Sequence, residues 1–116
     1  MKNITLATIK SILKNGGATI NNKGVRVTMK SGYQVSICDI AIISVSDFNK
    51  YILKELLTRL SSRGEYLGVW VDNGKVYIDI SRRIPTKAEA VAEGKRLNQI
   101  SILKWKNMEC ITVGEG

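Results

Sequence analysis

Two aspartates, Asp72 and Asp79, lie within residues 66–83, YLGVWVDNGKVYIDISRR, and carboxyl groups are the first candidates for catalysis. General acid–base catalysis near neutral pH recruits histidine or a carboxyl pair with shifted pKa values, and this chain has no histidine. The strand pairing expected for this segment places the two aspartates at opposite ends of an aromatic pair, so no dyad is expected. We expect Asp72 to hold a turn, and Asp79 to bond to a neighbouring backbone amide or to Arg82.

The two cysteines, Cys38 and Cys110, are far apart in sequence and lack the CxxC spacing of zinc or redox sites. Without a histidine to activate it, neither is expected to be a nucleophile, and both are interpreted as buried, reduced thiols. The glycines do not match the spacing of a phosphate-binding or dinucleotide-binding loop. The sequence therefore predicts a protein that is not an enzyme, with no catalytic residues, no cofactor and no metal.

The chemistry that remains is binding, and it centres on aromatic residues. Trp70, Tyr77 and Trp105, with Tyr66 beside them, could form a platform on the outer face of a sheet, where bases stack while cations contact the phosphates. The cations expected near this platform are Lys75, Arg82, Arg83, Lys104 and Lys106. The alternative is that the aromatic pair only stabilises the sheet.

The net charge of +8 is distributed unevenly along the chain. Nine basic and three acidic residues occur through residue 60, a net charge of +6, and the rest of the chain contributes +2. A partner with acidic groups, such as nucleic acid or an acidic protein surface, is therefore expected to dock mainly on the N-terminal half. The candidate contacts there are Lys23, Arg26 and Lys30. The alternative is a soluble surface that happens to be basic.

The element that must position the aromatic residues is a hairpin. Asn73 and Gly74 are the pair that a two-residue type I′ turn favours, because both positions need a positive φ. Counting outward from this turn pairs Trp70 with Tyr77 on one face. The other face is aliphatic and has to be covered by another element. Its residues are Leu67, Val69, Val71, Val76, Ile78 and Ile80.

The N-terminal part is expected to contain a helix followed by a β-meander. The helix covers residues 4–14, is capped by Thr5 or Asn3, and ends at Gly16. The strands that follow are residues 18–20, 25–29 and 33–37. Residues 39–45 could continue a strand or begin a buried helix, because periodicity does not separate the two for a short apolar run.

A central amphipathic helix is expected from Asp47 to about Ser62, capped by Ser44 or Ser46. Its apolar stripe, which includes Leu53, is interpreted as core packing and not as a groove for a partner.

The C-terminal part is predicted to fold as a ββαββ unit. Thr86, with Glu89 three residues later, forms a capping box, which is the clearest helix start in the chain. This helix extends to about Leu97. The strands that follow are residues 100–106 and 110–113. The simplest arrangement is a four-stranded antiparallel sheet whose aliphatic face packs against Val91 and Leu97.

The fold class expected from these elements is α+β, in one compact domain overall. The modules within it are residues 1–45 with the helix and meander, 46–64 with the central helix, and 65–116 with the ββαββ unit. No apolar run reaches the length of a membrane span, and the N-terminus lacks the layout of a signal peptide. A cytoplasmic protein that does not bind membranes is therefore expected.

The pattern Gly-x-Trp-x-Asp-x-Gly-x-x-Tyr-x-Asp, followed by an alanine-bearing helix and then Asn-Gln before a strand, occurs within residues 64–105. This pattern resembles the C-terminal module of small uncharacterised proteins of bacteriophages and mobile elements. Residues 14–36 similarly resemble an N-terminal segment of such proteins from phages of Gram-positive bacteria. The matching residues are Gly16, Gly17, Gly32, Tyr33, Gly68, Trp70, Asp72, Gly74, Tyr77, Asp79, Ala90, Asn98 and Gln99.

The resemblance implies a viral or mobile-element protein that acts in the cytoplasm of a host bacterium. Small motif-poor proteins of this kind are similar to inhibitors of host defence complexes, anti-CRISPR proteins among them, which need a binding surface and no active site. The first expectation is therefore a stoichiometric inhibitor that binds a host nuclease, either as a protein or as a nucleoprotein complex. The alternative is a DNA-binding or RNA-binding accessory protein of phage regulation or replication. An exposed strand edge would also leave a homodimer open.

Overall fold

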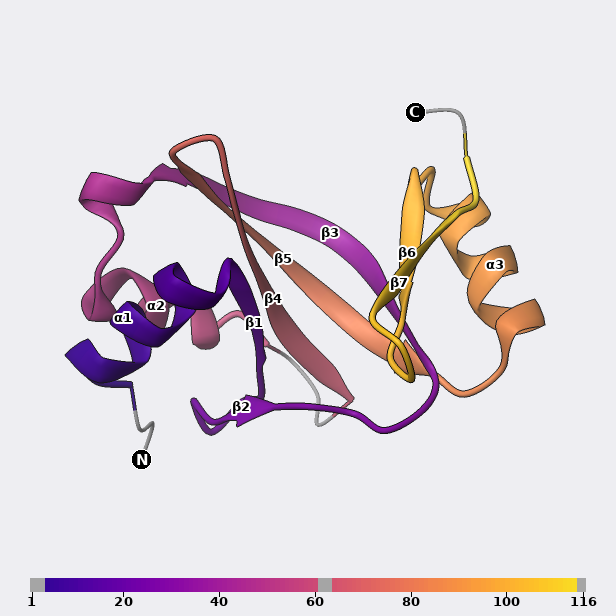
Figure 1. Ribbon diagram of the computed structural model, residues 1–116, viewed down its shortest axis with the longest axis horizontal. Helices are drawn as coiled ribbons and strands as arrows, with labels where there is room; N and C mark the ends of the chain where they lie inside the picture. Colours follow the sequence, from indigo (N-terminus) through magenta and orange to yellow (C-terminus); the bar gives the residue numbers. More distant parts are fainter. Residues whose placement is uncertain (1–3, 61–63, 115–116) are drawn as a thin grey trace.

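The structure is a computed structural model that describes residues 4–60 and 64–114, and it belongs to the α+β class, as predicted (Figure 1). In these residues, seven strands form one antiparallel sheet in the order β2-β1-β4-β5-β3-β6-β7. The elements are α1 (Leu6–Asn15), β1 (Gly17–Ile20), β2 (Arg26–Val27), β3 (Tyr33–Ser44), a 3₁₀ helix η1 (Val45–Asp47), α2 (Lys50–Leu57), β4 (Glu65–Asp72), β5 (Lys75–Ile84), α3 (Lys87–Arg96), β6 (Ser101–Lys104) and β7 (Glu109–Thr112). None of the described helices is long and apolar enough to cross a membrane.

The central hairpin of β4 and β5 has the predicted register. Trp70 pairs with Tyr77, and the pairing continues without a shift from the turn to the pair of Glu65 with Arg82. The turn residues Asn73 and Gly74 have φ values of 49° and 77°, as a type I′ turn requires. The local signal in this segment was therefore sufficient to specify both the turn and the two faces of the hairpin.

The predicted β-meander and ββαββ unit are wrong in their strand order. Residues 39–45 mostly continue the third strand, so β3 is a single strand of 12 residues with two irregularities in its register. This strand does not pair with β2; it pairs with β5 on one side and with β6 on the other. β1 and β2 lie beyond the opposite edge of the hairpin, where β1 pairs with β4. The hairpin therefore occupies the middle of the sheet, between strands from the N-terminal half.

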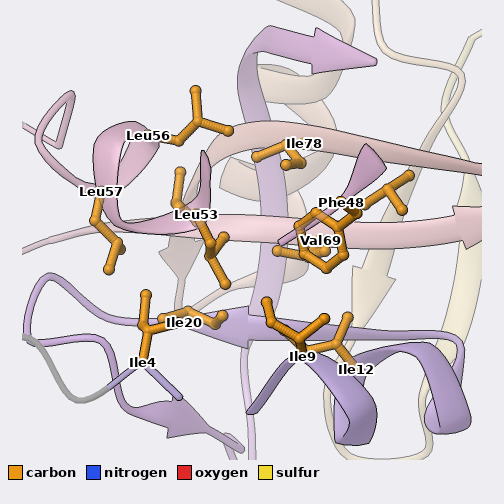
Figure 2. Packing of buried hydrophobic residues seen from close by; sticks show 12 residues of the cluster. Ile4, Ile9, Ile12, Ile20, Phe48, Leu53, Leu56, Leu57, Val69 and Ile78 are labelled. Atoms are coloured by element: carbon orange, nitrogen blue, oxygen red, sulfur yellow. The ribbon is translucent and has the colours of Figure 1, made fainter. Parts of the chain in front are cut away.

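The aliphatic face of the hairpin is covered by α1 and α2, and not by α3 as predicted. Leu53 of α2 and Ile9 of α1 lie in one buried cluster with Val69 and Ile78 of the hairpin. Figure 2 shows these side chains gathered between the two helices and the strands. α3 instead covers a second cluster at the other end of the sheet, whose buried residues are Val35, Ala90, Ile102 and Val113. Val91 and Leu97 pack, partly buried, against this second cluster.

The helix starts agree with the predicted caps in two of three cases. The Oγ1 atoms of Thr5 and Thr86 accept hydrogen bonds from Thr8 N, at 3.4 Å, and from Glu89 N, at 3.3 Å. α2 instead begins after Asn49, because the preceding residues form η1. It ends at Leu57, short of the predicted Ser62, which lies outside the described residues, as does the alternative cap Asn3.

The Thr86→Ala variant is expected to lower the free energy of unfolding by about 1 kcal/mol, because the amide of Glu89 at the start of α3 loses its acceptor. Chemical denaturation of the two proteins measures this difference. Thr86→Ser keeps a hydroxyl oxygen at the cap and should recover most of the loss. Equal stability of all three proteins would contradict the capping role.

Candidate functional site

In residues 4–60 and 64–114, the three α-helices pack on one face of the sheet, and none of them covers the other face, which we call the open face. Ile78 beneath α1 and α2 lies in phase along β5 with Arg82, and Arg82 pairs with Val35 beneath α3. On the open face, Trp70, Tyr77 and Ile42 lie side by side on β4, β5 and β3. Their exposed fractions are 55%, 36% and 63%. We call these three residues the aromatic row, and they form an exposed apolar strip across the centre of the sheet.

Asp79 lies in the next row on the open face, between Gly68 on β4 and Asp39 on β3. Its carboxyl group occupies the space above Gly68, where an added Cβ would clash with the Oδ1 atom of Asp79. Thr19 of β1 continues the row beyond Gly68. Glycine at position 68 therefore leaves room for a carboxyl group on the surface of the sheet.

The pKa of Asp79 is raised from 3.8 to about 7, chiefly because burial disfavours the charged form and also because the charge of Asp39 repels it. The backbone N–H of Gly68 donates a hydrogen bond to the carboxyl group, which acts in the opposite direction. This bond agrees with the expectation that Asp79 contacts a neighbouring amide. Asp39 could not have been found from the hairpin, because its position depends on β3 joining the sheet beside β5.

A hollow of about 570 Å³ opens over this row, and every strand of the sheet contributes to its lining. The lining includes Trp70 of β4, Asp79 of β5 and Trp105, which directly follows β6. The hollow's other polar lining residues include Thr19, Arg26, Gln34, Ser36, Ser81 and Gln99. The volume is within the range of about 300–1,000 Å³ that is usual for small-molecule sites.

Hydrogen bonds between strands hold part of this lining in place. The indole Nε1 of Trp105 donates to Oε1 of Gln34 at 3.1 Å, and Nε2 of Gln34 donates to Oγ of Ser81. Ser81 in turn donates to the backbone oxygen of Tyr66 at 3.5 Å. The Oγ atom of Ser36, which also lines the hollow, is buried and has no hydrogen-bond partner within the described part of the chain. Hydrogen bonds therefore hold part of the lining in place, and one buried hydroxyl oxygen of the lining, that of Ser36, is left unpaired in the described part of the chain.

The predicted aromatic platform is only partly present. Trp70 and Tyr77 are accessible, but Trp105 is buried, with 5% of its surface exposed, because its indole is held against Gln34. Tyr66 is partly buried. Stacking on the open face is therefore limited to the aromatic row.

The structure does not gather the predicted cations around the aromatic row. Arg82 lies on the helix-covered face and pairs with Glu65 at 3.8 Å, and Arg83 donates two hydrogen bonds to Ser31. Arg26 pairs with the core residue Ile20, so its guanidinium leaves the sheet on the helix side, where it donates to Ser11 of α1 at 3.0 Å.

Lys75 is exposed beside Tyr77 at the hairpin end. The other exposed candidates are Lys23, Lys30 and Lys106, whereas Lys104 is partly buried.

Both cysteines are free, but they are exposed and not buried as predicted. Cys38 lies at a register irregularity of β3, and Cys110 lies on the edge strand β7, where it lines the hollow. Within residues 4–60 and 64–114, no three His, Cys, Asp or Glu side chains are grouped as metal ligands. Comparison with protein-family models, with curated proteins and with solved structures found no match to this chain.

Proposed function

We propose that this protein acts by stoichiometric association and inhibits a nuclease complex of host defence, as its resemblance to phage and mobile-element proteins implies. The observation that supports association most strongly is the aromatic row. Three large apolar side chains, Trp70, Tyr77 and Ile42, are exposed beside one another on the central strands of the sheet. Exposed Trp and Tyr residues are the usual anchors of protein interfaces, where they enter pockets of the partner. The net charge of +8 favours a partner surface with acidic groups or bound nucleic acid.

The Trp70→Ala and Tyr77→Ala variants are expected to bind the nuclease complex at least about tenfold more weakly, because truncation of an anchor commonly costs more than about 1.4 kcal/mol. The measurement is a cleavage assay with increasing inhibitor, across several host nuclease complexes. The matched control is Tyr51→Ala, because Tyr51 is 70% exposed on α2, away from the aromatic row. Undiminished cleavage by every complex at molar excess of the wild-type protein would remove the proposal.

Direct binding of DNA or RNA is the second candidate, and the observation that favours it is the net charge of +8. A gel-shift titration at low salt separates the two candidates. A direct nucleic-acid binder loses affinity steeply as salt is added. Its binding releases counterions from the phosphates, and this release becomes less favourable at higher salt. Absence of binding to any nucleic acid at low salt would remove the second candidate and leave the first untouched.

A further inference from the structure

The charged residues that line the hollow on the open face are one acidic residue, Asp79, and one basic residue, Arg26. Asp39 is not one of the lining residues, but it pairs with Asp79 on the neighbouring strand β3. Within residues 4–60 and 64–114, the three ion pairs of the protein involve neither of these aspartates. The two carboxyl groups therefore lie side by side without a cation, although the chain has 18 lysines and arginines.

The groups that face Asp79 from the surrounding strands do not supply a cation. Asp39 faces it from β3, the N–H of Gly68 from β4, and the neutral Thr19 continues the row on β1. Arg26 on β2 lines the hollow, but its guanidinium donates a hydrogen bond to Ser11 of α1 on the helix side. On the other side, Leu103 of β6 and Cys110 of β7 line the hollow, and neither carries a positive charge. On β5 itself, the nearest in-phase residues are Tyr77 and Ser81, and the guanidinium of Arg83 is bonded to Ser31.

The remaining lining determines which kind of cation would fit. The indole of Trp70 can stack on a flat cationic group, and polar side chains such as Gln34 and the unpartnered Ser36 can bond to its N–H groups. A guanidinium group is planar, has five N–H donors, matches a carboxylate in a two-point contact and stacks on aromatic rings. A compact ammonium lacks the planar shape and the two-point geometry.

We propose that this hollow binds a guanidinium group, held by the carboxyl group of Asp79 against the indole of Trp70, with the charge of Asp39 beside it on the neighbouring strand. The group would be carried either by a free small molecule or by an arginine side chain of a peptide. Because the raised pKa of Asp79 leaves part of it protonated at neutral pH, the bound cation stabilises the ionised form. This proposal does not depend on the inhibitory function, because it rests on the lining of the hollow, although Trp70 belongs both to that lining and to the aromatic row.

The test is a two-dimensional NMR titration of the ¹⁵N-labelled protein with methylguanidinium and, separately, with an arginine blocked at both ends. Saturable shifts of signals from the hollow, including the indole N–H of Trp70, are expected with both cations. Tighter binding of the blocked arginine would assign the site to a peptide, and equal binding to a small molecule. Methylurea has a similar shape without the charge and should cause no saturable shift.

Removal of the charge of Asp79 in Asp79→Asn is expected to weaken binding of methylguanidinium at least about tenfold. Asp39→Asn changes an exposed residue and is a second variant that leaves the packing intact, with a smaller loss expected. The control is Asp72→Asn, at the exposed turn end of the same hairpin, which should bind like the wild type. Wild-type affinity should rise as the pH is raised from about 5.5 to about 8.5, across the pKa of Asp79 near 7.

Three results would overturn the proposal. They are the absence of saturable shifts at concentrations on the order of 10 mM, equal shifts with methylurea, and unchanged affinity of a folded Asp79→Asn protein. The amide spectrum of each variant shows whether it is folded. Loss of nuclease inhibition would not bear on these results, because the titration contains no nuclease.

Discussion

The Asp79→Asn variant is expected to be more stable than the wild type above pH 7, by up to about 4 kcal/mol in the free energy of unfolding. The pKa of Asp79 rises from 3.8 to about 7 on folding, because burial and the charge of Asp39 disfavour its ionised form. A shift of about three pKa units corresponds to about 4 kcal/mol, since each unit is worth about 1.4 kcal/mol. Asparagine keeps an oxygen that can accept the hydrogen bond from the amide of Gly68 and carries no charge.

The sign of this effect follows from which state of the protein holds the proton. Between about pH 4 and pH 7 the folded protein keeps the proton of Asp79 that the unfolded chain has lost, so the stability of the wild type falls as the pH rises. Above about pH 7 both states are ionised and the loss is complete. The variant lacks this fall, so the two proteins should differ little near pH 4 and most above pH 7. Denaturation at several pH values measures the difference, and a difference that does not change with pH would contradict the prediction.

The Leu53→Ala variant is expected to lower the free energy of unfolding by about 2–5 kcal/mol. Leu53 of α2 is fully buried between α1 and the hairpin, and its truncation removes apolar contacts and leaves a cavity (Figure 2). Urea denaturation measures the loss.

The matched control is Leu6→Ala on α1, because Leu6 is 60% exposed and the same change there should cost less than about 0.5 kcal/mol. Equal effects of the two substitutions would show that α2 does not cover the hairpin as the structure describes. A large loss for Leu53→Ala alone would establish that the stability of the β4–β5 hairpin depends on its cover by α2.

The parts of the fold that the sequence predicts correctly are those with local signals. The type I′ turn at Asn73 and Gly74, together with alternating side chains, determines the register of β4 and β5. The caps at Thr5 and Thr86 are local as well, because a side-chain oxygen bonds to an amide three residues later.

The order of strands could not be predicted, because it depends on contacts between residues far apart in the chain. The apolar pattern of residues 39–45 is compatible with a strand or a buried helix, and only pairing with β5 selects the strand. The aliphatic face of the hairpin likewise needed a cover, but the patterns of α2 and α3 did not show which helix would supply it. In the structure α2 contributes three buried leucines, whereas α3 is short of large apolar residues on its inner face.

In the candidate site, too, the residues placed by local signals were predicted, and those placed by contacts between distant parts of the chain were not. Trp70 and Tyr77 were found as an exposed pair, because their position depends only on the hairpin. Asp39 and the hollow were missed, because both exist only after β3 and the outer strands have joined the sheet. Trp105 was expected on the surface, but a hydrogen bond to Gln34, 71 residues away in sequence, holds its indole inside.

The placement of the hairpin between β1 and β3 has a consequence for biosynthesis (Figure 1). Both flanking strands leave the ribosome before the strands with which they pair, and β3 must wait for β5, which ends at Ile84. Until then the edges of β1 and β3 that face the hairpin have no partner, and open strand edges are where nascent chains associate wrongly. The sheet is therefore expected to close only when most of the polypeptide has been synthesised, in a single late step.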